Sequence, residues 1–518
     1  MNLSRPTRRD FLRLAGGAGT GALTLTSCGR LKGLASRMAI GPQPDELVPF
    51  TPPAGNGIDL ITHALNRLTW GAAPGEYHRV SALAATPEDS LRQFVEEQLA
   101  PGTLEDRFVH AALAPMEAIR EPVAELYEYK PAQLNDELTR QAVIRAVHSR
   151  RQLYEVMVAF WTDHFNIDSS KTDCRWFKVV DDRSVIRPHA LGNFRDLLKA
   201  SALSPAMLVY LDGRANRKRN DSERPNENYA RELLELHTLG VHGGYTQQDV
   251  MEAARCLTGW TVTGRETKNG LGDVAMGVAA LAGRDRGAGG IGRVFFDEGS
   301  HDNGAKTVLG TQLPAGGGKA DLDRLLDIVA FHPSTANFIA TKLCRQFIAD
   351  EPPQTAVNVV AAAFRDSRGD IKHTLRALFS TAEFASSRGT KIKRPFHFVV
   401  SALRAAHAST SAGSGVQRAL RVMGHAPFQY PTPEGPAPDG APWLSTLLHR
   451  WDFAVQLTAG RLPCSKINAS RLTECAGGRE GLLRHLFGRQ PDSSEIAAAD
   501  AVSDITALAL ASPAFQRF

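Results

Sequence analysis

The spacing of large apolar side chains along residues 153–165 is the feature that most constrains the fold of this chain. The stripe consists of Leu153, Val156, Met157, Phe160, Trp161, His164 and Phe165. Side chains that recur every three or four residues lie on one face of an α-helix. The pattern therefore predicts a helix that buries this face against other elements.

The same periodicity extends over most of the chain. Tyr229–Leu239 predicts a strong helix that ends before Gly240, and Thr246 with Asp249 forms the capping-box pattern of a helix N-terminus. Further helices are expected over 58–68, 88–99, 106–119, 121–129, 132–150, 190–200, 320–331, 333–349, 354–366, 369–380, 393–408, 415–423, 443–459 and 497–511. The fold class is therefore mainly α, with one large multi-helix domain.

Two stretches depart from the helical pattern. Residues 261–312 are rich in glycine and contain the extended run Arg293–Phe296, which predicts a small β excursion. Ala426–Pro442 holds six prolines and two glycines, so we expect an ordered loop that wraps the surface. We accordingly place a single helical domain at 58–518 with a β-containing insertion at 261–312.

The first 27 residues have the organisation of an export signal. Thr7–Arg13 follows the order of a twin-arginine signal, and Leu14–Ser27 is too short and too mildly apolar to span a membrane. We therefore expect export by the twin-arginine route to the periplasm or cell envelope.

Cys28 follows Leu25, Thr26 and Ser27 in the pattern of a bacterial lipobox. This predicts lipidation of Cys28 and anchoring to a membrane, with residues 28–57 as a flexible tether rich in proline and glycine. The alternative is that Cys28 merely lies near an ordinary cleavage site.

The charge and the cysteine content argue against a nucleic-acid partner and against a thiolate metal site. Sixty Lys and Arg against 55 Asp and Glu give +5, and removal of the signal leaves about +2, so a nucleic-acid partner is not expected. The other five cysteines contain no C-x-x-C pair, which argues against a thiolate metal site. A bridge between Cys464 and Cys475 stays open.

A polar stripe lies on the helix expected at 229–239. Asn228, Arg231, Glu232 and Glu235 are spaced so that a straight helix places them on one face. Two carboxylates one turn apart could bind a hard divalent cation or supply an acid and a base. Alternatively, Arg231 pairs with a neighbouring glutamate and Asn228 caps the helix, which gives an ordinary ion-pair network.

Three more residues complete the candidate site. His164 lies in an apolar stripe, so it is either a core histidine bonded to the backbone or a metal or catalytic residue. His301 and Asp302 precede a turn and either form that turn or enter a site. Our candidate catalytic residues are Glu232, Glu235, Arg231 and His164, and the candidate ligands of a divalent metal are His164, Glu232, Glu235, His301 and Asp302.

Several long stretches make the chain resemble a large bacterial family, the domain of unknown function 1800. They include His63–Trp70, Asn226–Leu236 and Thr258–Trp260, and the resemblance covers almost the whole chain after the signal. It implies a mainly helical exported protein, often encoded beside a partner similar to alkaline phosphatases or sulfatases, and it supplies no catalytic residue. The family usually shows Trp-His-x-His-Phe, where this chain has Thr162 in place of the first histidine.

Two functions are compatible with these features. The chain is either an exported metal- or cofactor-dependent enzyme with a polar site inside a helical bundle, or a non-catalytic, membrane-anchored scaffold that holds the phosphatase- or sulfatase-like partner. The paired acidic residues favour the enzyme, whereas the expected tether fits the scaffold equally well.

Overall fold

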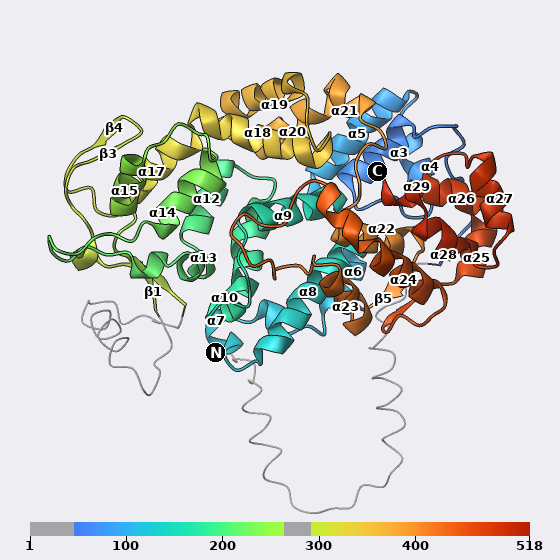
Figure 1. Cartoon of the computed structure of the whole chain (residues 1–518), viewed down its shortest axis with the longest axis horizontal. Helices are drawn as coiled ribbons and strands as arrows, with labels where there is room; N and C mark the ends of the chain where they lie inside the picture. Colours follow the sequence, from blue (N-terminus) through green and yellow to red (C-terminus); the bar gives the residue numbers. More distant parts are fainter. Residues whose placement is uncertain (1–45, 264–291) are drawn as a thin grey trace, which may run out of the picture.

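Helices dominate the structure, which confirms the mainly α fold (Figure 1). The computed structural model describes residues 46–263 and 292–518. The predicted signal, Cys28 and the first part of the predicted tether therefore lie outside the described residues.

The helices follow one another in three groups along the chain. The first group consists of α3 (Leu60–Leu68), α4 (Glu76–Ser81), α5 (Pro87–Leu99), η1 (Pro101–Thr103), α6 (Arg107–Leu113), η2 (Ala118–Arg120), α7 (Val123–Leu126), α8 (Pro131–His148) and α9 (Gln152–His164). The second consists of α10 (Cys174–Asp181), η3 (Asp182–Ile186), α11 (Arg187–His189), α12 (Phe194–Ala202), α13 (Pro205–Tyr210), η4 (Gly213–Ala215), α14 (Asn228–Glu232), η5 (Leu233–Thr238) and α15 (Gln247–Cys256). The third consists of η6 (Glu298–Ser300), α17 (Ala320–Ala330), α18 (Pro333–Phe347), α19 (Gln354–Asp366), α20 (Ile371–Phe379), α21 (Ala382–Ser386), α22 (Pro395–Ala405), α23 (Ser414–Val422), η7 (Ala441–Thr446), α24 (Leu447–Thr458), α25 (Ala469–Cys475), α26 (Arg479–Phe487), α27 (Ser493–Asp500), α28 (Ile505–Ala511) and α29 (Pro513–Gln516).

Three antiparallel pairs of short strands interrupt the helices within the described ranges. They are β1 (Trp260–Val262) with β2 (Val294–Phe296), β3 (Lys306–Val308) with β4 (Thr311–Leu313), and β5 (Ser409–Thr410) with β6 (Ser465–Lys466). In the first pair Trp260 faces Phe296, and in the second Lys306 faces Leu313. The first two pairs confirm the β excursion, whereas the third was not predicted.

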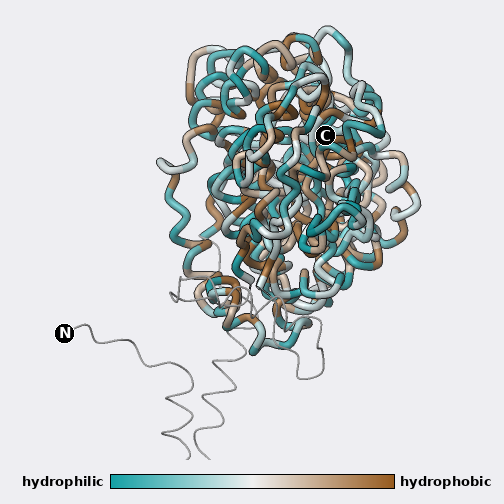
Figure 2. The backbone as a smooth tube through the Cα atoms, turned by 90° about the vertical axis from the view of Figure 1, so that its left-hand side faces the viewer, coloured by the Kyte–Doolittle hydropathy of each residue, from teal (hydrophilic) through white to brown (hydrophobic). Residues whose placement is uncertain are grey.

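Apolar side chains from α3 through α29 form one large buried core. Hydrophobic and hydrophilic residues alternate along the chain throughout this body, as expected for amphipathic helices packed on one another (Figure 2). A smaller cluster beside the core joins Leu126, Leu134, Leu138 and Val179 to Phe428, which belongs to the proline-rich loop. No helix in the described ranges is both long enough and apolar enough to cross a membrane.

Several predicted helices differ from the observed ones. The helix expected at 106–119 is interrupted after Leu113, close to Pro115, and the one expected at 497–511 is divided between α27 and α28. The helix expected at 229–239 is not straight, because its second half is the π-helix η5. A π-helix adds a residue per hydrogen-bonded turn, so the side chains after Glu232 leave the single face that α-helical spacing predicts.

The structure tests the predicted helix ends and the possible bridge between Cys464 and Cys475. The capping box at Thr246 and Asp249 is present, and Gly240 has the positive φ expected beyond a helix end. Cys464 and Cys475 are free thiols, so the bridge left open by the sequence is not formed.

Lys393 is a buried lysine whose replacement is expected to stabilise the protein. Its ammonium lies 3.7 Å from the centre of the Phe515 ring, and no carboxylate in the described ranges pairs with it. Burial, reinforced by Arg450, lowers the pKa of Lys393 from 10.5 to about 7. Below pH 7 the folded protein therefore carries the full cost of a buried charge.

We expect Lys393→Met to raise the free energy of unfolding at pH 7 by about 1–4 kcal/mol, as when other buried ions are replaced by apolar residues. Between pH 7 and 10.5 Lys393 is protonated in the unfolded chain but neutral in the folded protein, so the free energy of unfolding of the wild type rises with pH. The variant lacks this contribution. Urea denaturation from pH 6 to 10 measures both effects, with the exposed Lys130→Met as control. Equal pH slopes for wild type and Lys393→Met would contradict the prediction.

A candidate ligand pocket beneath the proline-rich loop

A cavity of about 60 Å³ lies in the middle of the helical body, beneath the proline-rich loop. Helices α8, α9 and α22, together with η3, form its walls, and residues 424–440, which we call the roof loop, cover it. The roof loop contributes Pro427, Phe428, Tyr430 and Pro436 to the lining. At about 10–15 Å³ for each water-sized probe, the cavity holds several such molecules.

One wall of the cavity carries a buried ion triad. Nη1 of Arg187 donates to both carboxylate oxygens of Glu155 at 3.0 Å, and Nε donates to Oδ2 of Asp182 at 2.9 Å. Burial alone would lower the pKa of Arg187, but Asp182 and Glu155 outweigh it and raise that pKa. The side chain of Gln141 also donates to Asp182. The triad is therefore tightly ordered and charged.

The π-helix η3 explains why Asp182 and Arg187 meet. The backbone N–H of Arg187 donates to the carbonyl of Asp182, five residues earlier, as in a π-turn. In a regular α-helix, residues five apart do not lie on the same face. Single π-turns of this kind are frequent at functional sites.

Two buried polar atoms of the lining have no hydrogen-bond partner in the described structure. They are Oδ1 of Asp182, an acceptor, and Nε1 of Trp70, a donor. The two residues are 1% and 3% exposed. Leaving a buried polar atom without a partner costs about 1–3 kcal/mol, so a hydrogen bond from a ligand or a water molecule would stabilise either atom.

The C-terminal end of α9 carries a second ion pair that lines the cavity. Nη1 of Arg394 lies 2.9 Å from Oδ2 of Asp163, the last residue but one of α9. Burial raises the pKa of Asp163, although Arg394 and Lys342 oppose the shift. Asp163 therefore keeps a proton to a higher pH than an ordinary aspartic acid.

His425 adds a neutral imidazole to the lining. Burial, with Arg394 and Arg450 nearby, lowers its pKa well below the ordinary value. Its Nδ1 accepts a hydrogen bond from the backbone N–H of Phe396 at 3.2 Å. The neutral ring consequently carries its proton on Nε2, which makes this nitrogen a donor.

The roof loop is held down by hydrogen bonds to its backbone. Nδ2 of Asn166 donates to the carbonyls of Tyr430 and Thr432 at 2.9 and 2.7 Å, and Tyr210 donates to Pro431. Gly435 approaches so closely that an added Cβ would lie 2.3 Å from the carbonyl of Asp163. The loop is thus ordered as predicted, but it also lines a cavity instead of only wrapping the surface.

His164 is buried as predicted, but it does not line the cavity. Nε2 lies 3.1 Å from the carbonyl of His237, and Nδ1 lies 2.9 Å from Nζ of Lys342. Burial, followed by Lys342 and His237, lowers its pKa well below the ordinary value. The arrangement matches the core histidine bonded to the backbone that the sequence left as one alternative.

Glu232 and Glu235 are half-buried and lie outside the cavity lining. Burial, together with Glu235 and Glu434, raises the pKa of Glu232. Glu235 accepts a hydrogen bond from the Tyr245 hydroxyl at 3.3 Å. The two carboxylates repel one another, and the described structure gives neither an arginine or lysine partner.

The other members of the predicted stripe have local partners. Arg231 pairs with Glu227 at 3.0 Å, which is the ion-pair alternative stated for it. Nδ2 of Asn228 donates to the carbonyl of Leu211 and to Asp212, so it ties two segments together and does not cap its own helix.

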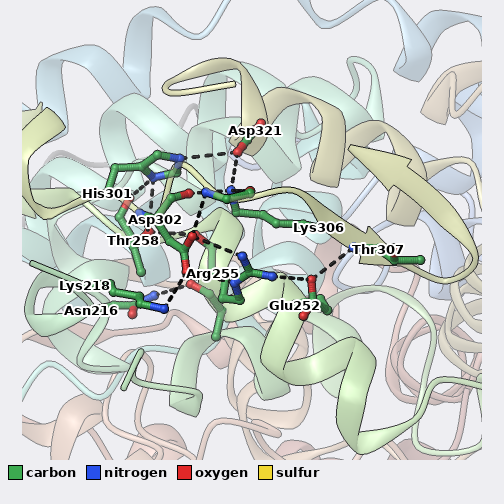
Figure 3. A network of polar contacts seen from close by, with 12 residues as sticks. Asn216, Lys218, Glu252, Arg255, Thr258, His301, Asp302, Lys306, Thr307 and Asp321 are labelled. Atoms are coloured by element: carbon green, nitrogen blue, oxygen red, sulfur yellow. Dashed lines mark hydrogen bonds and ion pairs between the residues drawn. The ribbon is translucent and has the colours of Figure 1, made fainter. Parts of the chain in front are cut away.

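His301 and Asp302 belong to a separate network that fastens the β excursion to α15 and α17 (Figure 3). Nδ1 of His301 lies 2.9 Å from the carbonyl of Thr258, and Nε2 lies 3.3 Å from Asp321. Asp302 accepts two hydrogen bonds from Arg255, at 2.8 and 3.1 Å. Figure 3 shows the imidazole and the carboxylate each turned toward partners inside this network.

Asp302 also forms the turn that the sequence indicated, since its Oδ1 accepts from the backbone N–H of Gly304. Burial alone would raise the pKa of Asp302, but Arg255 and Lys218 hold it well below the ordinary value. The network further contains Lys306, whose ammonium lies 2.7 Å from Asp321 with both side chains at 0% exposure. These contacts connect the β excursion to α15 and α17, which is a structural role.

The described residues do not assemble the predicted metal site. In the two described ranges, no group of three or more His, Cys, Asp and Glu is placed to hold a metal ion. His164, Glu232, Glu235, His301 and Asp302 therefore do not form one ligand set. The reason is that His164 is used by His237 and Lys342, while His301 and Asp302 are used by Arg255, Thr258 and Asp321.

The sequence pattern did not single out Glu155, Asp182, Arg187 or Arg394. The signal that could have found the triad is an acid and an arginine five positions apart within a helix, the π spacing. Thr162 lines the same cavity, at the position where the resembled family usually has its first histidine.

The comparisons with known proteins identify a family. Residues 63–517 match the family described as "Protein of unknown function (DUF1800)". No curated protein and no solved structure matches the chain. Because the match covers most of its length, the chain belongs to the DUF1800 family.

Proposed function

We propose that this protein is an exported enzyme whose active site is the cavity beneath the roof loop, and that it binds there a small carboxylate-bearing molecule. The proposal keeps a polar site inside the helical bundle and moves it from the acidic residues of α14 to Asp163, Asp182, Arg187 and Arg394. A helical cavity with ionisable residues of shifted pKa is the usual setting of an active site.

The observation that carries the proposal is the pair of unpartnered atoms, Oδ1 of Asp182 and Nε1 of Trp70. An acceptor on a ligand would satisfy Trp70, and a donor on the ligand or on a water molecule would satisfy Asp182. A cavity whose polar atoms are already paired would give no reason to expect a ligand.

The balance of donors in the cavity favours an anionic group. In the described structure Arg394 uses only Nη1, which leaves its Nε and Nη2 free to donate. Nε2 of His425 and Nε1 of Trp70 are further donors. The carboxylates are already paired, Glu155 and Asp182 with Arg187 and Asp163 with Arg394, so the free donors fit a carboxylate better than a divalent cation.

Asp163 supplies the acid–base chemistry. Burial raises its pKa, which favours the protonated acid, so Asp163 is the group placed to give a proton to a bound molecule. The rings of Phe396, Phe428 and Tyr430 form apolar walls against which the body of the molecule would pack.

Export and anchoring are part of the same proposal. The twin-arginine pattern and Cys28 support a place at the periplasmic side of a membrane. The alternative function, a scaffold for a phosphatase- or sulfatase-like partner, gives the buried triad and its cavity no role.

Two matched pairs of probes test carboxylate binding by calorimetry: benzoate against benzamide, and succinate against succinamide. We expect at least one carboxylate to bind about 10–100 times more tightly than its amide, which is what a charge-assisted hydrogen bond of about 1.5–3 kcal/mol supplies. Arg394→Met should abolish that preference. Arg376→Met, which removes an exposed pair with Glu96, should leave it unchanged.

Two results would overturn the proposal. One is that neither carboxylate binds better than its amide. The other is that Arg394→Met, shown to be folded by its thermal transition, binds the carboxylate as wild type does. Either result would favour the scaffold.

A further inference from the structure

An exposed apolar stripe runs along η7 and α24. Leu444, Leu448, Trp451 and Val455 are 47%, 69%, 47% and 43% exposed. Their spacing of four, three and four residues places them on one face of the helix. Contiguous exposed apolar side chains of this size mark an interaction site more often than single ones do.

The exposed stripe does not contribute to packing α24 against the rest of the protein. The opposite face of the helix already buries Phe453, Ala454 and Leu457, each 2% exposed or less. Trp451 is fixed in place, because its indole N–H donates to the carbonyl of Ala511 at 3.1 Å. The helix therefore presents apolar side chains on both faces, and only one face has a partner in this fold.

Unpaired cations lie on the elements that contact α24 and on the segment that follows it. Arg418 and Arg421 lie on α23, which packs against α24, while Lys466 lies on β6, which also contacts α24. Arg461 follows the end of α24. These four side chains are exposed, and the described ranges provide none of them with a carboxylate partner. Against them stand Asp452 on α24 itself and Asp504, whose carboxylate accepts a hydrogen bond from Thr458 of α24.

The N-terminal end of the described chain lies at the same end of the molecule. The carbonyl of Leu47 accepts from the side chain of Arg471 on α25, the helix that follows β6. Figure 1 shows α23, α24 and α25 together at the lower right. Residues 29–46 separate Leu47 from Cys28, a span that reaches at most roughly 65 Å when fully extended.

We propose that the surface formed by Leu444, Leu448, Trp451 and Val455 with Arg418, Arg421, Arg461 and Lys466 docks on an anionic lipid membrane. The apolar side chains would enter the boundary between headgroups and acyl chains, and tryptophan is favoured at that depth. The four cations would lie against lipid phosphates. The proposal uses the predicted lipid on Cys28 only to indicate which end faces the membrane, and it does not depend on the ligand pocket.

The first test measures binding without the lipid anchor. Full-length protein with Cys28→Ser is sedimented with vesicles of phosphatidylcholine containing 30% phosphatidylglycerol. We expect Leu448→Glu with Val455→Glu to lower the partition coefficient about tenfold or more. Val359→Glu, which charges an equally exposed valine (50%) on α19, should leave it unchanged. Arg418→Glu with Arg421→Glu should weaken binding to these vesicles and have no effect on the weaker binding to pure phosphatidylcholine.

The second test reports on Trp451 itself, so binding through any other part of the chain cannot imitate it. Vesicles that contain dibrominated lipid should quench part of the tryptophan fluorescence, and Trp451→Phe should remove most of that quenched part. The proposal is overturned if the stripe variants bind as wild type does, or if Trp451→Phe leaves the quenching unchanged. A dimer that dissociates in Leu448→Glu would likewise overturn it in favour of a second copy of the chain.

Discussion

Asp321→Asn is expected to lower the free energy of unfolding by about 3–5 kcal/mol, the cost of leaving a buried charge without its partner. Asp321 and Lys306 are both completely buried, and their charged groups lie 2.7 Å apart. Asparagine would keep the size of the side chain and one acceptor oxygen, but it would remove the negative charge that balances the Lys306 ammonium, which otherwise contacts only two backbone carbonyls. A loss of this size is a large part of the 5–15 kcal/mol typical of a folded protein.

The matched control is Asp323→Asn, two residues further along α17. Its side chain is 45% exposed and pairs with Arg195 and Lys199, so we expect less than about 1 kcal/mol. Lys306→Met combined with Asp321→Leu should recover much of the loss, because it removes both charges together. Urea denaturation measures all three variants. Equal losses of unfolding free energy in Asp321→Asn and Asp323→Asn would contradict the prediction that the buried pair stabilises the fold more than the exposed one.

Arg187→Met is expected to have an effect of similar size, about 3–5 kcal/mol, and to abolish ligand binding as well. Arg187 is the common partner of Glu155 and Asp182, at 3.0 and 2.9 Å. Without it, two carboxylates that are 4% and 1% exposed on their side chains repel each other inside the protein. The cavity loses its most buried cation at the same time.

The informative control for Arg187→Met is a second substitution that removes one of the stranded charges. Arg187→Met with Glu155→Gln should be more stable than Arg187→Met alone, although it should still fail to bind benzoate or succinate. The comparison needs urea denaturation and calorimetry on the same preparations. If Glu155→Gln lowers stability further, the loss comes from packing and not from uncompensated charge.

The sequence predicted the mainly α fold because apolar spacing and helix caps are local signals. The capping box at Thr246 and the helix end at Gly240 depend on residues close together in the chain, and both were found. The π-helices η3 and η5 were not predicted, because no local sequence signal marks them. Their sequences contain no proline or glycine inside them to mark the extra residue, and tertiary contacts decide whether a helix accommodates it.

The candidate site was less predictable than the fold. His164 was correctly placed in the core, but which neighbour meets its ring depends on Lys342, far away in the sequence. The acidic stripe at Glu232 was inferred from the geometry of a straight helix, which η5 does not have. Cavity residues such as Trp70 and Arg394 come from distant segments, and no spacing rule connects them.

The roof loop has a consequence for the order in which the protein matures. The cavity walls are complete once α22 is made, whereas its cover extends to Pro436 and is fastened to α9 and α13 far upstream. A ribosome must therefore synthesise more than four-fifths of the chain before the site can close. Any molecule that needs the closed site can be captured only after translation is nearly finished, and nascent or truncated chains that stop before the roof loop would be unable to retain it.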